Sequence, residues 1–173
     1  MRQGGHLISV PLAYKTRRID FGDGEKLAMT IPWGDVSTAS ATTGIPNIEV
    51  YIPCSPAMVA WAMRANRLKW LLGMGVVQNF MKRRIERTVR GPSAVKRDTQ
   101  PTFVWGEVTN ARGDKRTARI KTANGYSLTV TGALAVVEHL LTHDVPGGTY
   151  TPATLIGRDL VMRLPGSGPM QIA

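Results

Sequence analysis

A stretch punctuated by prolines and glycines, residues 30–51, constrains the fold of this chain more than any other. Its apolar run ends at Pro32, which lacks a backbone N–H and so closes a strand. After the turn at residues 33–34, Asp35 occupies the position of a helix N-cap, where its carboxylate can accept backbone N–H bonds. Gly44 favours the end of a short helix, after which alternating residues indicate a second strand. Strand, turn, helix, turn and strand are therefore predicted, either as an ordinary connection or as the lining of a cleft.

The rest of the chain combines hairpins with helices. Around turn residues, paired extended runs predict two hairpins, the first from residues 16–21 and 26–31 and the second from residues 102–108 and 116–122. Further strands are predicted over residues 6–13, 47–52 and 170–172, and helices over residues 56–72, 76–89, 127–142 and 151–164. This pattern predicts an α+β fold with a mixed, largely antiparallel sheet and helices packed on one face.

Two of the predicted helices carry specific sequence signals. Ser55 is a favourable N-cap with proline at the first helical position, and the glycines at positions 73 and 75 divide the helical pattern that follows. On the helix over residues 127–142, apolar residues recur at helical spacing and predict one stripe facing a core. The stripe consists of Leu128, Leu134, Val137, Leu140 and Leu141.

Length and composition indicate an ordinary globular protein. The chain has 173 residues, of which 43% are hydrophobic and 20% charged, so we expect residues 1–173 to form a single domain with a full core. Its one cysteine, Cys54, excludes an internal disulfide framework and fits a reducing cytoplasm. Neither a secretory signal peptide nor an apolar run long enough to span a membrane is recognisable. We therefore expect a cytoplasmic protein.

A formal net charge of +10 favours anionic partners. The strongest basic cluster begins at Lys82, Arg83 and Arg84, which we take as candidate anion-binding residues, and it continues through Arg87, Arg90, Lys96 and Arg97. Its interpretations are a solvated basic face, a nucleic-acid site or a membrane-surface site. The spacing of Trp70 and Phe80 fits a core better than base stacking. We expect neither nucleic acid nor a membrane surface as the partner, and both stay open as alternatives.

Three other patterns have simpler structural explanations. The two glycines at positions 73 and 75 match the start of a dinucleotide fingerprint, but Gln78 replaces the third glycine and no strand precedes them. His139 and His143 have the spacing of metal ligands, yet a third ligand is not apparent, and we expect no metal. Cys54 could act as a nucleophile only beside a base, so a small buried thiol is the preferred interpretation.

Six stretches together resemble the C-terminal half of bacterial saccharopine dehydrogenase-like oxidoreductases. They occur in order over about residues 5–165, and Gly157 follows the last of them. The stretches are RIDFGDG (18–24), IPWGDVSTA (31–39), TGIPNIEVY (43–51), WGEVTN (105–110), GYSLT (125–129) and GTYTPA (148–153). A departure from the family lies at Ser40 and Ala41, where bulkier and more polar residues are expected.

The resemblance implies an α+β domain that packs on a Rossmann domain, covers the active-site cleft and helps dimerisation. The Rossmann half with its nucleotide fingerprint is absent from this chain, so we expect no cofactor bound by the chain alone, whereas NAD(P) serves the full-length family. We expect a substrate-side and oligomerisation domain that is inactive without a Rossmann partner, and a homodimer that covers its apolar surface. A nucleic-acid-binding protein and a structural dimerisation or membrane-surface module are the alternatives.

The candidate substrate-binding residues are Trp33, Asp35, Thr43 and Gly44. Asp35 could hold a polar group and Trp33 could stack on a ring. The structural alternatives are that Asp35 caps its helix and that Trp33 fills the core. Catalytic residues are not identifiable from the sequence.

Overall fold

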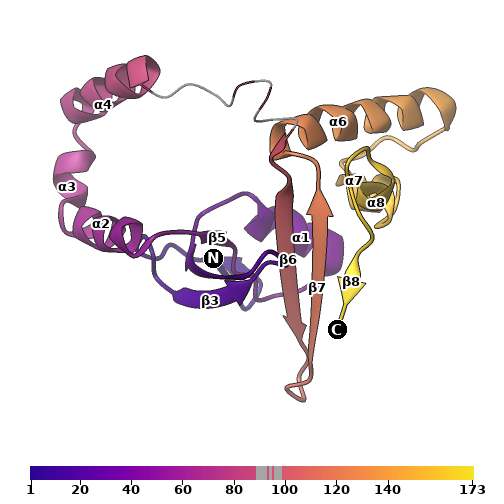
Figure 1. Ribbon diagram of the computed structural model, residues 1–173, viewed down its shortest axis with the longest axis horizontal. Helices are drawn as coiled ribbons and strands as arrows, with labels where there is room; N and C mark the ends of the chain where they lie inside the picture. The colour runs from indigo at the N-terminus through magenta and orange to yellow at the C-terminus, as the bar shows by residue number, and fades with distance from the viewer. Residues whose placement is uncertain (89–92, 94, 96–98) are drawn as a thin grey trace. The chain divides into compact units, whose positions relative to one another are not determined.

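The computed structural model describes residues 1–88, 93, 95 and 99–173, which divide into two compact units (Figure 1). The first unit comprises Met1–Ile19 and Lys26–Gly91, and the second comprises Asp20–Glu25 and Pro92–Ala173. Helices accompany three small antiparallel sheets, which confirms the α+β class. The strands form separate sheets rather than the one sheet expected. That residues 1–173 make up a single domain stays a prediction.

The first unit begins with a short hairpin made of β1 (Arg2–Gln3) and β2 (His6–Leu7). Gly4 and Gly5 both have positive φ, as a two-residue turn between twisted strands requires. The predicted strand over residues 6–13 is therefore wrong beyond Leu7. In the following sheet the strand order is β3 (Thr16–Asp20), β4 (Glu25–Thr30), β5 (Tyr51–Pro53). The predicted first hairpin is confirmed, whereas β5 begins later than expected.

Helix α1 (Asp35–Thr43) connects β4 to β5. Its N-cap is Gly34, so the prediction that Asp35 caps the helix is wrong. Asp35 lies instead in the first turn, where a negative charge is favourable near the positive end of the helix dipole. The predicted helix end is confirmed, because Gly44 adopts a left-handed φ of 70° and its N–H donates to the Ser40 carbonyl at 2.8 Å.

Three helices follow β5: α2 (Pro56–Arg67), α3 (Lys69–Leu72) and α4 (Gly75–Thr88). Ser55 caps α2 by accepting the Met58 N–H at 3.2 Å, and the predicted division near residues 73–75 is confirmed. A continuous helix over residues 56–72 is a wrong prediction, because α2 ends at the C-cap Leu68. Figure 1 shows α4 at the end of this run, apart from α1 and the strands of its own unit. Helix α4 buries none of its residues. Trp70 and Phe80 are exposed, so their prediction as core residues is wrong.

The buried apolar side chains of the first unit come from two strands and two helices. Ile19 and Ala28 lie on β3 and β4, Val36 on α1, and Ala62 and Ala65 on α2. Most of these side chains are small, and none is a leucine or methionine. The first unit by itself therefore buries little of its large apolar surface.

The second unit is built on a long hairpin of β6 (Thr102–Thr109) and β7 (Lys115–Thr122), as predicted. The pairing runs from Thr102 opposite Thr122 to Thr109 opposite Lys115, and β8 (Gln171–Ile172) pairs with the other edge of β7. The helices are α6 (Gly125–Thr142), α7 (Pro152–Leu155) and α8 (Leu160–Arg163). A continuous helix over residues 151–164 is a wrong prediction, because Gly157 adopts a φ of 113° between α7 and α8. In the described part of the chain, no helix is long and apolar enough to cross a membrane.

Candidate functional site

The first unit contains an apolar pocket of about 240 Å³. Strand β4, helix α2 and the segment that precedes β3 form its walls. The lining residues are Leu12, Ala13, Met29, Thr30, Ile31, Met58, Trp61 and Ala62. The lining is almost wholly apolar, with Thr30 as its one polar residue.

One side chain holds the pocket's first wall in place. The Asn66 amide on α2 accepts the Leu12 N–H at 2.9 Å and donates to the Leu12 carbonyl, also at 2.9 Å. The next residue, Ala13, has a φ of 53°, a left-handed conformation that costs a residue with a Cβ about 1–2 kcal/mol. A strained backbone conformation persists only where the surrounding structure stabilises it. Residues of this kind occur often in ligand-binding segments.

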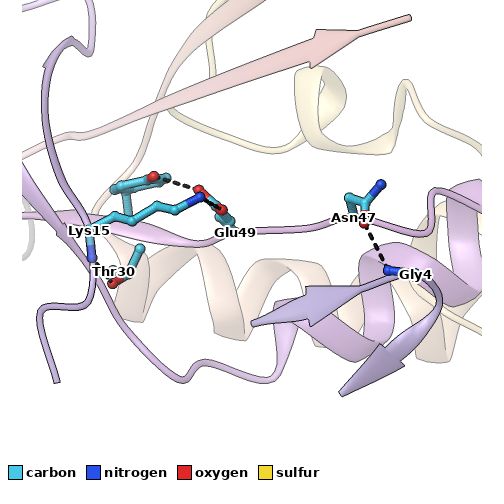
Figure 2. Close-up of polar contacts among 6 residues, drawn as sticks. Gly4, Lys15, Thr30, Asn47 and Glu49 are labelled. Atoms are coloured by element: carbon cyan, nitrogen blue, oxygen red, sulfur yellow. Dashed lines mark hydrogen bonds and ion pairs between the residues drawn. The ribbon is translucent and has the colours of Figure 1, made fainter. Parts of the chain in front are cut away.

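A polar cluster, drawn in Figure 2, shares the residue Thr30 with the pocket. Thr30 belongs to both, since it lines the pocket while its hydroxyl accepts the Lys15 N–H at 3.1 Å. The Lys15 ammonium forms an ion pair with the Glu49 carboxylate. The Tyr51 hydroxyl donates to the second Glu49 oxygen at 2.6 Å. A lysine, a glutamate and a tyrosine are thus joined to one another, and Thr30 links this cluster to the pocket.

The electrostatics of this cluster favour charged groups at neutral pH. Burial alone raises the pKa of the Glu49 carboxyl, but hydrogen bonds from Lys15 and Tyr51 and the nearby cations outweigh it and hold the pKa below its ordinary value. The hydrogen bond to Glu49 raises the pKa of Lys15 above its ordinary value, despite the opposing effect of desolvation. A general acid or base works best with a pKa near the working pH. Lys15 and Glu49 are therefore suited to binding and orientation rather than to proton transfer.

The predicted substrate-binding residues lie around α1, and all four are exposed. Trp33 and Asp35 are at its N-terminal end, whereas Thr43 and Gly44 are at its C-terminal end, about 13 Å away along a nine-residue helix. Trp33 is 54% exposed, so its alternative role as a core residue is wrong. The structure does not bring the two pairs together, and substrate binding by these residues stays a prediction.

The candidate anion-binding residues Lys82, Arg83 and Arg84 are exposed on α4. Arg87 extends this basic group by one further turn of the same helix. Three other members of the predicted cluster, Arg90, Lys96 and Arg97, lie outside the described residues.

The two candidate histidines stack on each other. The rings of His139 and His143 stack with centroids 4.2 Å apart, and Nδ1 of His143 lies 3.1 Å from the His139 carbonyl. Among the described residues, no three His, Cys, Asp or Glu side chains gather as metal ligands. Cys54 is a half-buried free thiol whose pKa is raised by burial, which makes it a poor nucleophile.

Sequence reasoning did not identify Lys15, Glu49, Tyr51 or Asn66 as site residues. Glu49 and Tyr51 are two positions apart in an extended segment, which places their side chains on the same face. This spacing was the one available signal. Lys15 and Asn66 reach their partners across 34 and 54 residues of sequence, and no local pattern predicts such contacts.

A second apolar feature of the protein, besides the pocket of the first unit, lies on helix α6. Its inner side contacts its own unit, where a Cβ at Gly132 would lie 3.6 Å from Leu164. On the outer side, five exposed apolar residues recur three or four positions apart and form a stripe along the helix. We call these residues the outer stripe: Tyr126, Val130, Leu134, Val137 and Leu141. The prediction of a single core-facing stripe is therefore wrong for Leu134, Val137, Leu140 and Leu141, which are exposed.

Comparisons with protein-family models, with curated proteins and with solved structures found no match. A function for the chain is therefore inferred from its own residues, from the two surfaces of α6 and from the pocket of the first unit.

Proposed function

We propose that this chain is the substrate-side and oligomerisation domain of a saccharopine dehydrogenase-like, NAD(P)-dependent oxidoreductase. It acts together with a Rossmann domain that supplies the nucleotide site. The six resembling stretches support this proposal, and so does the α+β class that the resemblance implies. The chain's own part in hydride transfer is to bind and orient the substrate.

The observation that carries the proposal is the outer stripe of α6. Leu134 is 63% exposed and Leu141 is 82% exposed, on an 18-residue helix whose opposite side also contacts its own unit. A helix that is apolar on both sides is typical of a protein interior. Contiguous apolar surface of this kind marks an interaction site, so we expect another protein surface to cover α6.

The stripe has the symmetry that a homodimer requires. Four of its residues form two pairs, Tyr126 with Leu141 and Val130 with Val137, and each pair is equidistant from the middle of α6 beside Leu134. When two copies of the helix pack antiparallel about a twofold axis, Tyr126 meets Leu141 of the partner subunit and Val130 meets Val137 of the partner subunit. This arrangement also brings the opposite ends of the two helix dipoles together.

The area of the stripe fits such a contact. Each of its five side chains is more than half exposed, so together they supply much of the ~800 Å² that each partner contributes to a standard interface. The neighbouring residues of the helix, Leu140 among them, would supply the remainder of the contact. A second copy of the chain is therefore the occupant that we propose.

The apolar pocket is our candidate for contact with the substrate. Its lining accepts an apolar group, and the nearby Lys15 and Glu49 offer a cation and an anion to a polar part of the same molecule. Because both side chains keep their charges at neutral pH, they position the substrate and leave the redox step to the nicotinamide.

The test is a titration with NADH and NADPH, followed by nicotinamide fluorescence. Its samples are this chain, the Rossmann domain encoded upstream or nearby, and a mixture of the two. We expect no binding by this chain, binding by the Rossmann domain, and substrate-dependent oxidation of the cofactor only in the mixture. Tight NADH binding by this chain alone would contradict the proposal, as would a Rossmann domain that turns over equally well without it.

A further inference from the structure

The α3–α4 segment presents apolar side chains to solvent. Trp70 on α3 is 72% exposed, and Val76 and Phe80 on α4 are 79% and 65% exposed. Met74, in the turn between the two helices, is also exposed. Trp70 and Met74 border an open depression of about 620 Å³ that is otherwise lined by Asn66, Arg67 and Gly73. A stretch of helix that buries nothing and exposes such large groups needs an apolar environment to cover them.

Basic side chains follow directly on the same helix. Lys82, Arg83, Arg84 and Arg87 occupy the second half of α4, with Glu86 as the one acidic residue of the helix. All of these residues are exposed, and Lys82, Arg83, Arg84, Glu86 and Arg87 show no ion pair with one another. The apolar and the cationic groups therefore belong to one exposed surface of the first unit.

From this arrangement we infer that α3 and α4 bind the surface of an anionic phospholipid membrane. Helix α4 lies in the plane of the interface with Val76 and Phe80 inserted among the acyl chains. Arg83, Arg84 and Arg87 lie three, four and seven positions after Phe80 and so share its side of the helix, and their long side chains reach back to the headgroups. Trp70 takes the interfacial position that its amphipathic ring favours.

Charge complementarity identifies the lipid as anionic. Four basic residues on one amphipathic helix are typical of segments that bind phosphatidylserine or phosphoinositide headgroups. Each basic side chain near such a surface strengthens binding about fivefold, and salt weakens the attraction. Insertion of apolar side chains then supplies a part of the binding that salt does not remove.

Nucleic acid is the competing anionic partner, and the apolar residues argue against it. A single-strand site needs aromatic rings interleaved with its basic groups, for the bases to stack on. Here Phe80 precedes the basic residues, and Lys82, Arg83, Arg84 and Arg87 enclose only Ile85 and Glu86. Val76 would have no role in contacting phosphates. The inference does not depend on the proposed oxidoreductase function.

Co-sedimentation of the whole chain with vesicles tests this inference. One set of vesicles contains phosphatidylcholine alone and the other contains phosphatidylcholine with phosphatidylglycerol. We expect binding to the anionic vesicles that weakens but persists at high salt. The tryptophan emission shifts to the blue on binding, and Trp70→Phe removes most of that shift.

Two sets of substitutions separate the apolar and the charged contributions. The triple variant Lys82→Gln, Arg83→Gln, Arg84→Gln should weaken binding on the order of a hundredfold. The double variant Val76→Ser, Phe80→Ser should abolish the binding that persists at high salt. As matched controls, Arg112→Gln, Lys115→Gln, Arg116→Gln removes the same charge from the β6–β7 hairpin, and Val108→Ser removes an exposed apolar group from β6. Both controls should bind like the unchanged chain.

Three outcomes would overturn the inference. The first is no binding to anionic vesicles, and the second is equal binding to neutral vesicles. The third combines two results. The triple variant loses a gel shift with single-stranded RNA or DNA that the double variant keeps, and the double variant binds vesicles like the unchanged chain. Since all substituted residues are exposed, thermal unfolding of each variant should match that of the unchanged chain.

Discussion

Lys15 and Glu49 form an ion pair that joins the segment before β3 to the segment before β5. The Tyr51 hydroxyl fixes the other carboxylate oxygen of Glu49, and the backbone of Lys15 exchanges hydrogen bonds with Thr30. The pair thereby links three parts of the first unit at the edge of the apolar pocket. We therefore expect the pair to stabilise the first unit.

Replacing Glu49 with glutamine should lower the free energy of unfolding by about 1 kcal/mol at neutral pH, the range of a partly exposed ion pair and its hydrogen bond. The folded-state pKa of Glu49 lies below its ordinary value of 4.5. The stabilisation is therefore fully present above pH 4.5 and is lost as the pH falls through the folded-state pKa. Urea unfolding at several pH values should show that the difference from Glu49→Gln shrinks below pH 4.5. Glu86→Gln, at an exposed position on α4, is the control, and an equal effect there would contradict the assignment.

Substitution of Asn66 with alanine should release the segment that carries Leu12 and Ala13. Two hydrogen bonds to the Leu12 backbone are lost, which should cost about 1–2 kcal/mol. Hydrogen exchange read by mass spectrometry should show faster exchange over residues 8–15, while β6 and β7 keep their protection. Asn79→Ala on α4 should leave the exchange unchanged. Unaltered exchange in the Asn66 variant would mean that other contacts hold this wall of the pocket.

Ala13→Gly should stabilise the chain, because glycine adopts a φ of 53° without the penalty that alanine pays. After the larger entropy loss of glycine is subtracted, we expect a gain of about 0.5 kcal/mol. The same change at Ala41, inside α1, should instead cost about 0.5–1 kcal/mol. Thermal unfolding of the two variants should shift in opposite directions. A loss of stability at both positions would show that Ala13 is not strained.

The sequence predicts most of the elements because their signals are local. Proline and serine at the start of α2, glycine at the end of α1 and the alternating residues of β6 and β7 each act within a few positions. The prediction is wrong where a neighbouring residue can act as the cap or where a glycine interrupts an otherwise helical pattern. Gly34 rather than Asp35 caps α1, and Gly157 interrupts the helix expected near the C-terminus.

The candidate site is harder to predict, because its contacts join distant segments. Nothing near Lys15 in the sequence indicates Glu49, and nothing near Asn66 indicates Leu12. Apolar spacing on a helix also does not say which surface covers it. Leu134 and Phe80 fit a core by pattern, yet both are exposed. The pattern cannot separate the two cases, because the same apolar residues suit a protein interior and a surface that binds a partner.

The mass of the chain in solution tests the dimer at the centre of this account most directly. Light scattering should give twice the chain mass of 18.8 kDa, and Leu134→Glu, which places a charge at the proposed twofold axis, should give the single mass with its helical circular dichroism retained. Phe80→Glu, an equally exposed apolar position on α4, is the control and should leave the dimer intact. A monomeric unchanged chain, or a dimer that Leu134→Glu does not weaken, would contradict the account.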